Sequence, residues 1–379
     1  MKKSFAEILT GLDEGTGKKV KKKIPAWEGA VIPSALSLEQ CSSQAAAEYK
    51  CRLLKRFFPK GPNSVCDLTC GLGVDSLAFS KIAGKVTSFE RSETLADAAR
   101  GNFLNFGAGN IEVRREEVGP ATDFPACDVF YADPARRDVS GHKVFRLEDC
   151  SPDIKPLIPL LLAKSSMVLL KLSPMADISL LAGTFGQKLR EIHIVSLHSE
   201  VKELLCVLSP ENTDMYAVNA VELDAPEEAF CFRPEEEKHA RAEYAEEATA
   251  GQYLHEPCPG LLKSGAFHLM GERFGFKEAD RSTRLYLADH PVRSHLMRTF
   301  MIEHVLPLSN AGIKEARGLY PEASVSARNI PAGSEALRRK LGAGESRERH
   351  IFGCSVAGRR MLLLCRRFPE QMPGPENMV

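Results

Sequence analysis

A glycine-rich turn between an apolar strand segment and a helix constrains this chain more than any other feature. Residues 64–68 supply the apolar strand character, and residues 77–79 begin a helix. Between them, Gly71 and Gly73 allow a tight turn and a close approach of the backbone to a ligand. A strand, turn and helix joined in this way are typical of a cofactor site, so we expect one here.

From residue 64 onward, strand segments alternate with helical segments through short connections. This alternation predicts an α/β fold with a doubly wound parallel sheet. The expected strands are 64–68, 85–90, 110–114, 127–132 and 166–172, and the expected helices are 74–82, 92–105, 153–164 and about 176–188. Two further strands, 192–197 and 204–208, are separated by a short turn and should pair antiparallel at the sheet edge. The sheet would then be a seven-stranded one.

Composition and length limit the classes of protein that remain. A length of 379 residues suits two or three domains. The 50 basic and 50 acidic residues balance, so any attraction to nucleic acid must be local. Eleven cysteines without a C-x-x-C pair predict reduced thiols in the cytoplasm and no bound metal. The most apolar segment, 157–172, is interrupted by Pro159 and two lysines, so we expect no membrane span.

The region before the first strand combines a basic cluster with helical segments. The cluster at residues 18–23 predicts a solvated tether rather than a dedicated RNA contact. Residues 37–40 fit a capping box, and residues 45–54 have the composition of a helix. One or two helices should therefore precede the first strand.

The charge balance changes twice after residue 210. Residues 211–256 hold 13 acidic and three basic side chains, which predicts a boundary or an exposed linker. A helix at 260–270 and a short strand at 284–288 indicate a small α+β module. Residues 310–369 hold 12 lysines and arginines against five glutamates, and include a helix at 334–341. This basic region could follow a phosphate backbone or form a solvated charged face, and both interpretations stay open.

The residues around the glycine turn favour one class of cofactor. A dinucleotide site requires G-x-G-x-x-G, but here Ser76 stands in place of the third glycine. Asp67 precedes the turn, where a carboxylate would repel a pyrophosphate but suits an amino-acid ammonium group. S-adenosylmethionine is therefore favoured over NAD. Glu90 ends the second strand, where it could accept hydrogen bonds from both ribose hydroxyls or cap the following helix. Glu116 or Glu117 could reach the adenine amino group.

A second motif follows the fourth strand, where Asp133 is succeeded by Pro134. The proline frees the preceding carbonyl from the strand ladder. In an open α/β sheet this carboxyl end lies beside the first strand, at the switch point where ligands bind. We therefore expect Asp133 to face the methyl group of the cofactor.

Together these motifs resemble those of the class I S-adenosylmethionine-dependent methyltransferases, over roughly residues 35–230. The resemblance implies a Rossmann-like sheet in the order 3-2-1-4-5-7-6 with an antiparallel seventh strand. It implies cofactor contacts by residues of the two motifs and of the neighbouring strand ends: Asp67, Thr69, Gly71, Gly73, Asp75, Glu90, Glu116 and Asp133.

The whole chain also resembles a bacterial group of methyltransferases with a ferredoxin-like module and a THUMP-like C-terminal domain. Short motifs carry this resemblance, at residues 37–40, 49–50, 133–136, 171–174, 265–267, 328–331 and 337–341. It implies an N-terminal helical extension, a methyltransferase domain, a ferredoxin-like module and a THUMP-like basic domain, at 1–60, 61–230, 231–298 and 299–379. THUMP domains bind RNA, so the resemblance implies an RNA partner, either rRNA or tRNA, and no DNA.

The loop after the fourth strand bears on which atom is methylated. Amino-group methyltransferases carry Asp/Asn-Pro-Pro-aromatic there, whereas this chain has Ala135 and Arg136 in the last two places. Carbon methylation in the similar 5-methyluracil enzymes needs a cysteine nucleophile where this chain has Ser173, so we favour a base nitrogen. The catalytic candidates are Asp133, Pro134, Arg136 and Lys171, and the RNA-binding candidates are Arg136, Arg137, Arg338, Arg339 and Lys340. The alternatives are a methyltransferase acting on a small molecule or protein, and a non-catalytic RNA-binding scaffold.

Overall fold

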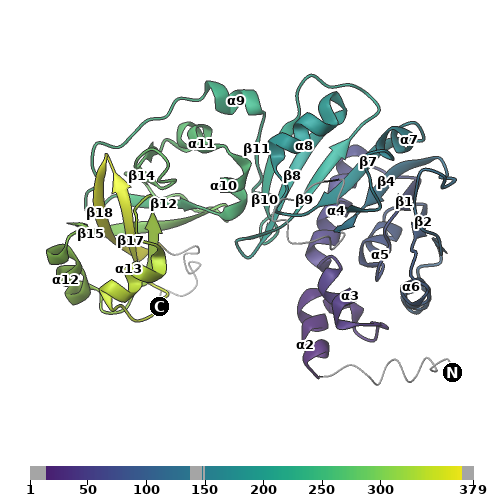
Figure 1. The fold of residues 1–379 in the computed structure, drawn as a ribbon, viewed down its shortest axis with the longest axis horizontal. Helices are drawn as coiled ribbons and strands as arrows, with labels where there is room; N and C mark the ends of the chain where they lie inside the picture. Colours follow the sequence, from purple (N-terminus) through teal and green to yellow (C-terminus); the bar gives the residue numbers. More distant parts are fainter. Residues whose placement is uncertain (1–13, 137–146, 148–149, 369–379) are drawn as a thin grey trace, which may run out of the picture. The chain divides into compact units, whose positions relative to one another are not determined.

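The structure is a computed structural model that describes residues 14–136, 147 and 150–368 (Figure 1). The chain divides into two compact units, Met1–Val195 with Lys202–Ala217, and Ser196–Val201 with Val218–Val379. The two units are described separately below. Within the described residues, none of the helices has the length and apolar character needed to cross a membrane.

The first unit contains the expected doubly wound sheet. Its strands are β1 (Ser64–Asp67), β2 (Lys85–Phe89), β3 (Ile111–Arg114), β4 (Cys127–Ala132), β7 (Ser165–Leu172), β8 (Leu189–Leu197) and β9 (Glu200–Leu208). They lie in the order β3-β2-β1-β4-β7-β9-β8, which is 3-2-1-4-5-7-6 when the strands are counted along the chain. The pairs from β3 to β7 are parallel, and β9 pairs antiparallel with β7. The α/β fold class is confirmed.

A two-residue turn joins the last two strands of this sheet. Both of its residues, His198 and Ser199, have positive φ, at 53° and 58°. A two-residue hairpin turn with positive φ at both positions matches the twist of the flanking strands. The predicted hairpin is therefore confirmed, with strands longer than expected. Its placement at the edge of a seven-stranded sheet was wrong, because the sheet has nine strands and two of them continue it beyond β8.

From residue 44 onward, the α-helices of the first unit are α4 (Gln44–Phe57), α5 (Val74–Ser80), α6 (Glu93–Asn105), α7 (Ile158–Leu162) and α8 (Ile178–Phe185). The short strands β5 (Ala135–Arg136) and β6 (Cys150–Ser151) pair with each other. The helix predicted at 153–164 is shorter than expected because Pro156 and Pro159 restrict where it can begin. The helix predicted at 176–188 ends at Gly186, which has a φ of 53° and starts a separate 3-10 turn.

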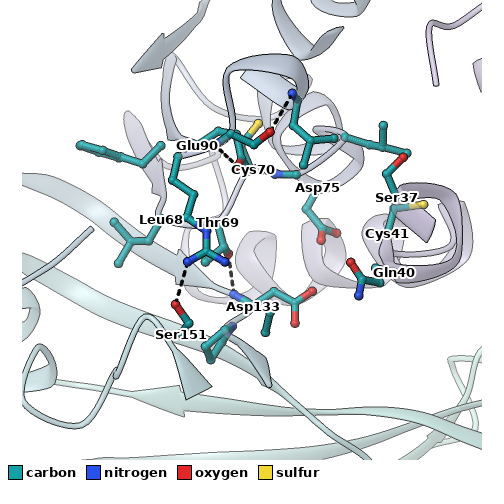
Figure 2. A pocket seen from close by; sticks show the side chains of 18 of the residues that line it. Ser37, Gln40, Cys41, Leu68, Thr69, Cys70, Asp75, Glu90, Asp133 and Ser151 are labelled. Carbon is teal, nitrogen blue, oxygen red and sulfur yellow. Dashed lines mark hydrogen bonds between the residues drawn. The ribbon is translucent and has the colours of Figure 1, made fainter. Parts of the chain in front are cut away.

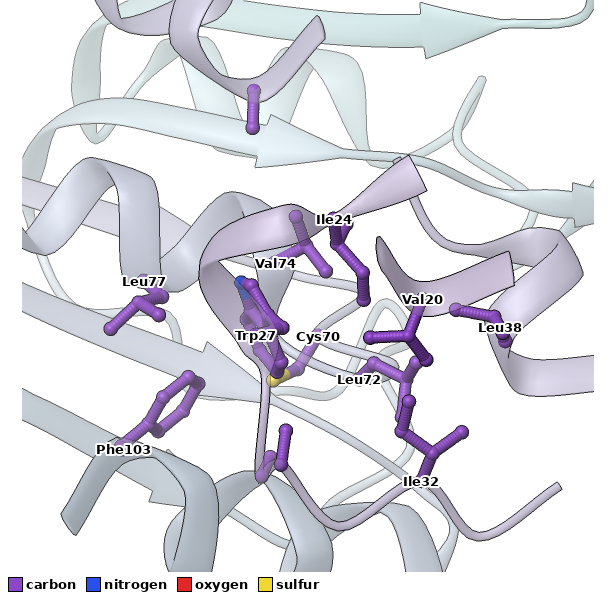
Figure 3. Packing of buried hydrophobic residues seen from close by; sticks show 13 residues of the cluster. Val20, Ile24, Trp27, Ile32, Leu38, Cys70, Leu72, Val74, Leu77 and Phe103 are labelled. Atoms are coloured by element: carbon purple, nitrogen blue, oxygen red, sulfur yellow. The ribbon is translucent and has the colours of Figure 1, made fainter. Parts of the chain in front are cut away.

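The basic cluster near the N-terminus is part of a packed helix, so the prediction of a solvated tether was wrong. Helix α2 (Glu14–Lys23) and the short helix η1 (Pro25–Trp27) bury Val20, Ile24 and Trp27 in one core cluster with Leu72 and Phe103 (Figure 3). Lysines dominate the composition of this segment, but Val20 on α2 and Ile24, which directly follows α2, are both buried.

The α2 segment also holds a further helix in place. Lys23 Nζ donates hydrogen bonds of 2.8 and 2.7 Å to the carbonyl oxygens of Leu38 and Glu39, at the end of α3 (Ala35–Gln40). These carbonyls belong to the last turn of α3, which lacks partners within the helix. The capping box of α3 is formed by Ser34 and Ser37, three residues before the one predicted.

The second unit is a seven-stranded sheet with helices. Its elements are β10 (Ala217–Glu222), β11 (Phe230–Phe232), α9 (Pro234–His239), β12 (Tyr253–Pro257), α10 (Pro259–Ser264), α11 (Phe267–Phe274), β13 (Lys277–Glu278), β14 (Tyr286–Ala288), β15 (Met297–Pro307), α12 (Asn310–Leu319), β16 (Ser324–Arg328), α13 (Ser334–Leu341), β17 (Arg349–Val356) and β18 (Arg359–Arg367). The main sheet has the order β13-β14-β12-β15-β18-β17-β16, while β10 and β11 pair antiparallel.

Two predictions for this region need correction. The acidic segment 211–256 is more than a linker, because β10 buries Val218, Ala220 and Val221. The single helix expected at 260–270 is two helices, since Gly265 has a φ of 81° and ends α10. The predicted helix at 334–341 is confirmed as α13.

Ile24 is expected to stabilise the first unit through its buried side chain. Ile24 is fully buried, so Ile24→Ala should lower the free energy of unfolding by about 2–5 kcal/mol. Leu104→Ala is the matched control, because Leu104 is 82% exposed and its loss should have little effect. Urea denaturation followed by circular dichroism measures both variants. Equal stability of the Ile24 variant and the wild type would contradict the packing described for α2.

Candidate functional site

A cavity of about 810 Å³ opens at the carboxyl ends of the strands of the first unit (Figure 2). Its walls come from the glycine turn, the ends of β2, β3, β4 and β7, and the α3 segment: residues within 33–42, 68–75, 89–95, 116–118, 133–135, 151–152 and 171–173 contribute the lining. This is the edge at which open α/β sheets bind ligands. The volume is within the range of small-molecule sites.

Glu90 holds the backbone of the glycine turn beside the cavity. Gly71 N donates a 2.8 Å hydrogen bond to one carboxylate oxygen of Glu90, and Ser92 N donates a 2.8 Å hydrogen bond to the other. A β-carbon on Gly73 would lie 2.4 Å from the Phe103 ring, and its φ of 87° also favours glycine. Since each oxygen of a carboxylate accepts two hydrogen bonds, Glu90 keeps acceptor capacity toward the cavity.

Asp67 lies beneath the turn and is outside the residues that line the cavity. It is buried, accepts a 3.0 Å hydrogen bond from Thr69 N, and accepts another from the Ser76 hydroxyl. Burial raises the pKa of Asp67 to about 7. The side chain thus shapes the turn, and the structure does not bring it to the wall where we expected it to meet an ammonium group.

Asp75 lies on the cavity wall instead, and a buried lysine holds it there. Lys50 is fully buried, with its Nζ 3.0 Å from Asp75 Oδ1 and 3.0 Å from Glu203 Oε1. The Tyr131 and Ser42 hydroxyls donate hydrogen bonds of 2.8 and 2.7 Å to Asp75 Oδ2. Burial raises the pKa of Asp75, but the charges of Lys50 and Lys171 and the hydrogen bonds from Ser42 and Tyr131 together lower it below its ordinary value.

The role of Lys50 was missed by sequence reasoning, although one signal was present. Lys50 follows Ala46 and Ala47 at helical spacing and precedes Leu53 and Leu54, so it lies on the buried face of α4. A lysine on such a face needs an opposite charge. Its partners are far away along the chain, so the sequence alone could not name them.

Asp133 and the glycine turn are directly connected. Asp133 N donates a 2.7 Å hydrogen bond to the Thr69 hydroxyl, and the Asp133 carboxylate forms an ion pair with Lys171. Burial lowers the pKa of Lys171, but Asp133, Glu203 and Asp75 together raise it above its ordinary value. Lys171 is therefore a fixed positive charge. Figure 2 shows the side chains of Asp75 and Asp133 directed toward the same open space.

The remaining predicted residues are distributed over both units. Pro134 and Glu116 line the cavity, as does Glu117, which is paired with Arg91 at 3.4 Å. The RNA-binding candidates Arg338, Arg339 and Lys340 lie on α13 in the second unit. Arg137 and the Arg136 side chain lie outside the described residues.

Further cavity residues come from the α3 segment, whose sequence fitted helix capping and closure over a cofactor equally well. Ser37, Gln40 and Cys41 line the cavity, and their side chains are visible in Figure 2. In the part of the chain that the structure describes, no cluster of three or more His, Cys, Asp or Glu side chains is arranged to hold a metal.

Comparison with known proteins gives matches over the whole chain. Residues 253–294 match a ferredoxin-like domain family, and residues 297–367 match a THUMP domain-like family. The crystal structure of a "putative methyltransferase" from Porphyromonas gingivalis W83 is 31% identical, with a TM-score of 0.81, and the match covers 97% of this chain and 95% of that one.

A curated relative matches a shorter segment. Protein-L-isoaspartate O-methyltransferase of Rhodopseudomonas palustris is 32% identical over 92 residues. That segment is 24% of this chain, and it spans only 40% of the length of the relative.

The raised pKa of Asp67 predicts a pH-dependent contribution to stability. Its folded pKa of about 7 exceeds the ordinary value of 3.8, so the folded state binds the proton more tightly. The stability that Asp67 contributes is therefore present below about pH 4 and falls as the pH rises toward 7. Asp67→Asn removes this titration. Between about pH 4 and 7, the unfolding free energy of the wild type should therefore fall relative to that of the variant. The fall should be up to about 1.4 kcal/mol per pH unit.

Urea denaturation of both proteins at pH 5, 6, 7 and 8 measures this difference. Asp97→Asn is the control, because Asp97 is exposed on α6 and pairs only with Arg100 at the surface. A difference between wild type and Asp67→Asn that stays constant from pH 5 to 8 would contradict the burial described for Asp67.

Proposed function

The chain belongs to the class I methyltransferase family that carries ferredoxin-like and THUMP-like domains, and we propose that it transfers the methyl group of S-adenosylmethionine to a base nitrogen in RNA. The observation that carries this proposal is the convergence of Glu90, Asp75 and Asp133 on one cavity. Glu90 follows β2, Asp133 follows β4, and Asp75 lies in the first turn of α5.

The cavity residues suit the polar groups of S-adenosylmethionine. Glu90 would accept from the ribose hydroxyls, and Glu116 would accept from the adenine amino group. Asp75, whose pKa is lowered by Lys50, stays ionised and would attract the ammonium group, which replaces the contact expected from Asp67. Gly73 is outside the residues that line the cavity, and its lack of a side chain lets the turn pack against Phe103. When bound, the cofactor supplies an electrophilic methyl group on a positively charged sulfur.

The residues of the chain would act mainly by positioning. Methyl transfer to nitrogen requires an in-line approach, so a fixed acceptor for the amino group is the main requirement. Asp133 is such an acceptor, because Thr69 holds its backbone and Lys171 holds its carboxylate. Lys171 keeps its proton, so it is unsuited to act as a base, and the proton released by the nitrogen would pass to Asp133 or to water.

A nitrogen target is favoured over a carbon target by the thiols and hydroxyls at the cavity. Carbon methylation of a pyrimidine needs an activated nucleophile. Burial raises the pKa of Cys70 well above its ordinary value, so this thiol stays protonated. The residue at the place of the nucleophilic cysteine is Ser173, whose hydroxyl accepts a 3.2 Å hydrogen bond from Met175 N.

The choice of RNA rests on the second unit. Residues 297–367 match the THUMP domain-like family, and the region 310–369 carries 12 lysines and arginines against five glutamates. A protein substrate is the alternative, because the relative from Rhodopseudomonas palustris is named for action on L-isoaspartate in proteins. The assay below distinguishes these substrates by the molecule that receives the label.

Glu90 is expected to determine cofactor affinity. Glu90→Gln removes the carboxylate charge that would accept hydrogen bonds from the two ribose hydroxyls. We therefore expect S-adenosylhomocysteine to bind at least tenfold more weakly. Isothermal titration calorimetry measures the affinity, with Glu93→Gln as the control because Glu93 is exposed nearby on α6. Wild-type affinity in the Glu90 variant, or no binding to the wild-type protein, would rule out the cofactor site described here.

Asp133 is expected to determine turnover rather than cofactor affinity. With tritiated S-adenosylmethionine and total RNA from a strain that lacks this gene, Asp133→Ala should lower kcat by about 100-fold or more. Its affinity for S-adenosylhomocysteine should stay within about threefold of wild type, because Glu90 and Asp75 are retained. Asp153→Ala is the matched control, because its side chain accepts a local hydrogen bond from Lys155 N and is outside the residues that line the cavity.

Three outcomes would contradict the proposal. Equal rates for Asp133→Ala and wild type would remove Asp133 from the catalytic site. Label found in protein rather than RNA would favour the alternative substrate. Cofactor binding without transfer to any substrate would favour a non-catalytic scaffold.

A further inference from the structure

A group of charged side chains gathers on one face of the second unit's sheet. Glu256 on β12 is 2% exposed, and it accepts a 2.5 Å hydrogen bond from Arg298 on β15 and a 2.8 Å hydrogen bond from Arg328 on β16. The two arginines are 44% and 38% exposed. A buried carboxylate therefore holds two guanidinium groups at the surface.

The strand register places a third arginine on the same face. Side chains that are directly opposite on neighbouring strands point to the same side of a sheet. Glu256 is opposite Arg298, and Phe300, two residues further along β15, is opposite Arg367 on β18. Arg328 is opposite Cys354 in the same way.

The apolar neighbours identify this face of the sheet. Phe300 and Cys354 belong to one core cluster, together with Leu254 and Phe352. The other face is covered by α12 and α13, through a separate cluster that includes Leu337. Arg298, Arg328 and Arg367 thus lie on the face away from these two helices.

The pKa of His350 reflects the positive charges around it. It is 7% exposed and stacks on Phe352, with ring centroids 4.1 Å apart. Burial, followed by the charges of Arg298, Arg328 and Arg367, lowers the pKa of His350 to about 3. The charges of all three arginines therefore act on the same buried side chain at this end of the face.

Arg298 and Arg328 keep hydrogen-bond donors for a ligand. A guanidinium group has five N–H donors in a planar fork, and Glu256 receives one hydrogen bond from each of Arg298 and Arg328. Planar forks that are held in position suit the oxygen atoms of a phosphate. Burying the Glu256 carboxylate costs desolvation free energy. This cost fits a carboxylate that positions two arginines for binding a ligand.

We propose that Arg298, Arg328 and Arg367 bind a backbone phosphate of the RNA, on the sheet face opposite α12 and α13. The inference rests on the proposed RNA substrate. It assigns the phosphate contact to a different surface from Arg338, Arg339 and Lys340. Arg338 on α13 is already paired with Glu335 of its own helix, with hydrogen bonds of 3.1 and 3.2 Å.

The test measures how a fluorescein-labelled 20-nucleotide single-stranded RNA binds to the full-length protein between 50 and 200 mM KCl. Arg367→Gln leaves the Glu256 contacts intact, and the double variant Glu256→Gln with Arg328→Gln removes the buried charge together with its partner. Each should weaken binding at least fivefold and reduce the salt slope by about 0.7, the value for one phosphate contact on a single strand. Arg339→Gln is the matched control, because Arg339 is 73% exposed on α13, and it should bind within twofold of wild type.

Each possible result has a defined meaning. Wild-type affinity and salt slope in both variants, or a loss confined to Arg339→Gln, would overturn this site. If these variants bind like wild type while the wild-type protein still methylates RNA, only this inference fails. If the wild-type protein neither binds the probe nor methylates RNA, the proposed function fails with it. Submillimolar binding of inorganic phosphate, measured by calorimetry and lost in Arg367→Gln, would assign the site to free phosphate and overturn the RNA contact.

Discussion

The buried ammonium group of Lys50 is the interaction on which the candidate site depends. Lys50 extends from α4 and is balanced by Asp75 on α5 and Glu203 on β9. Removing one member of such a buried group leaves an uncompensated charge, at a cost of about 3–5 kcal/mol. This buried group therefore holds α4, α5 and β9 together beside the cavity.

Two further hydrogen bonds complete the candidate site. Glu90 binds the backbone of the glycine turn from the end of β2, and the Thr69 hydroxyl binds the backbone of Asp133 after β4. The turn is thus tied to both neighbouring strands of the sheet. Lys23 holds the end of α3, which contributes another wall. Carboxylates from separate strand ends can converge on one ligand because each is held by a contact within the same unit.

Local patterns in the sequence were sufficient for most of the first unit. Gly71 and Gly73 indicated the turn, and the alternation of apolar runs indicated the strands, because these signals depend on neighbouring residues. The packed α2 helix was missed because its lysines outnumber Val20, the apolar residue that it buries. In the second unit, the long strand β15 went unpredicted, since its pairing with β12 and β18 comes from distant segments.

The sequence by itself determined the α/β fold, the position of the glycine turn and the methyltransferase family, because these follow from local periodicity and short motifs. Only the tertiary structure decided which charged groups meet. Asp67 is turned inward by Thr69 and Ser76, so Asp75 reaches the cavity in its place. Arg328 meets Glu256 across four steps of the sheet order. Such contacts depend on how strands order and curve, and no local pattern records them.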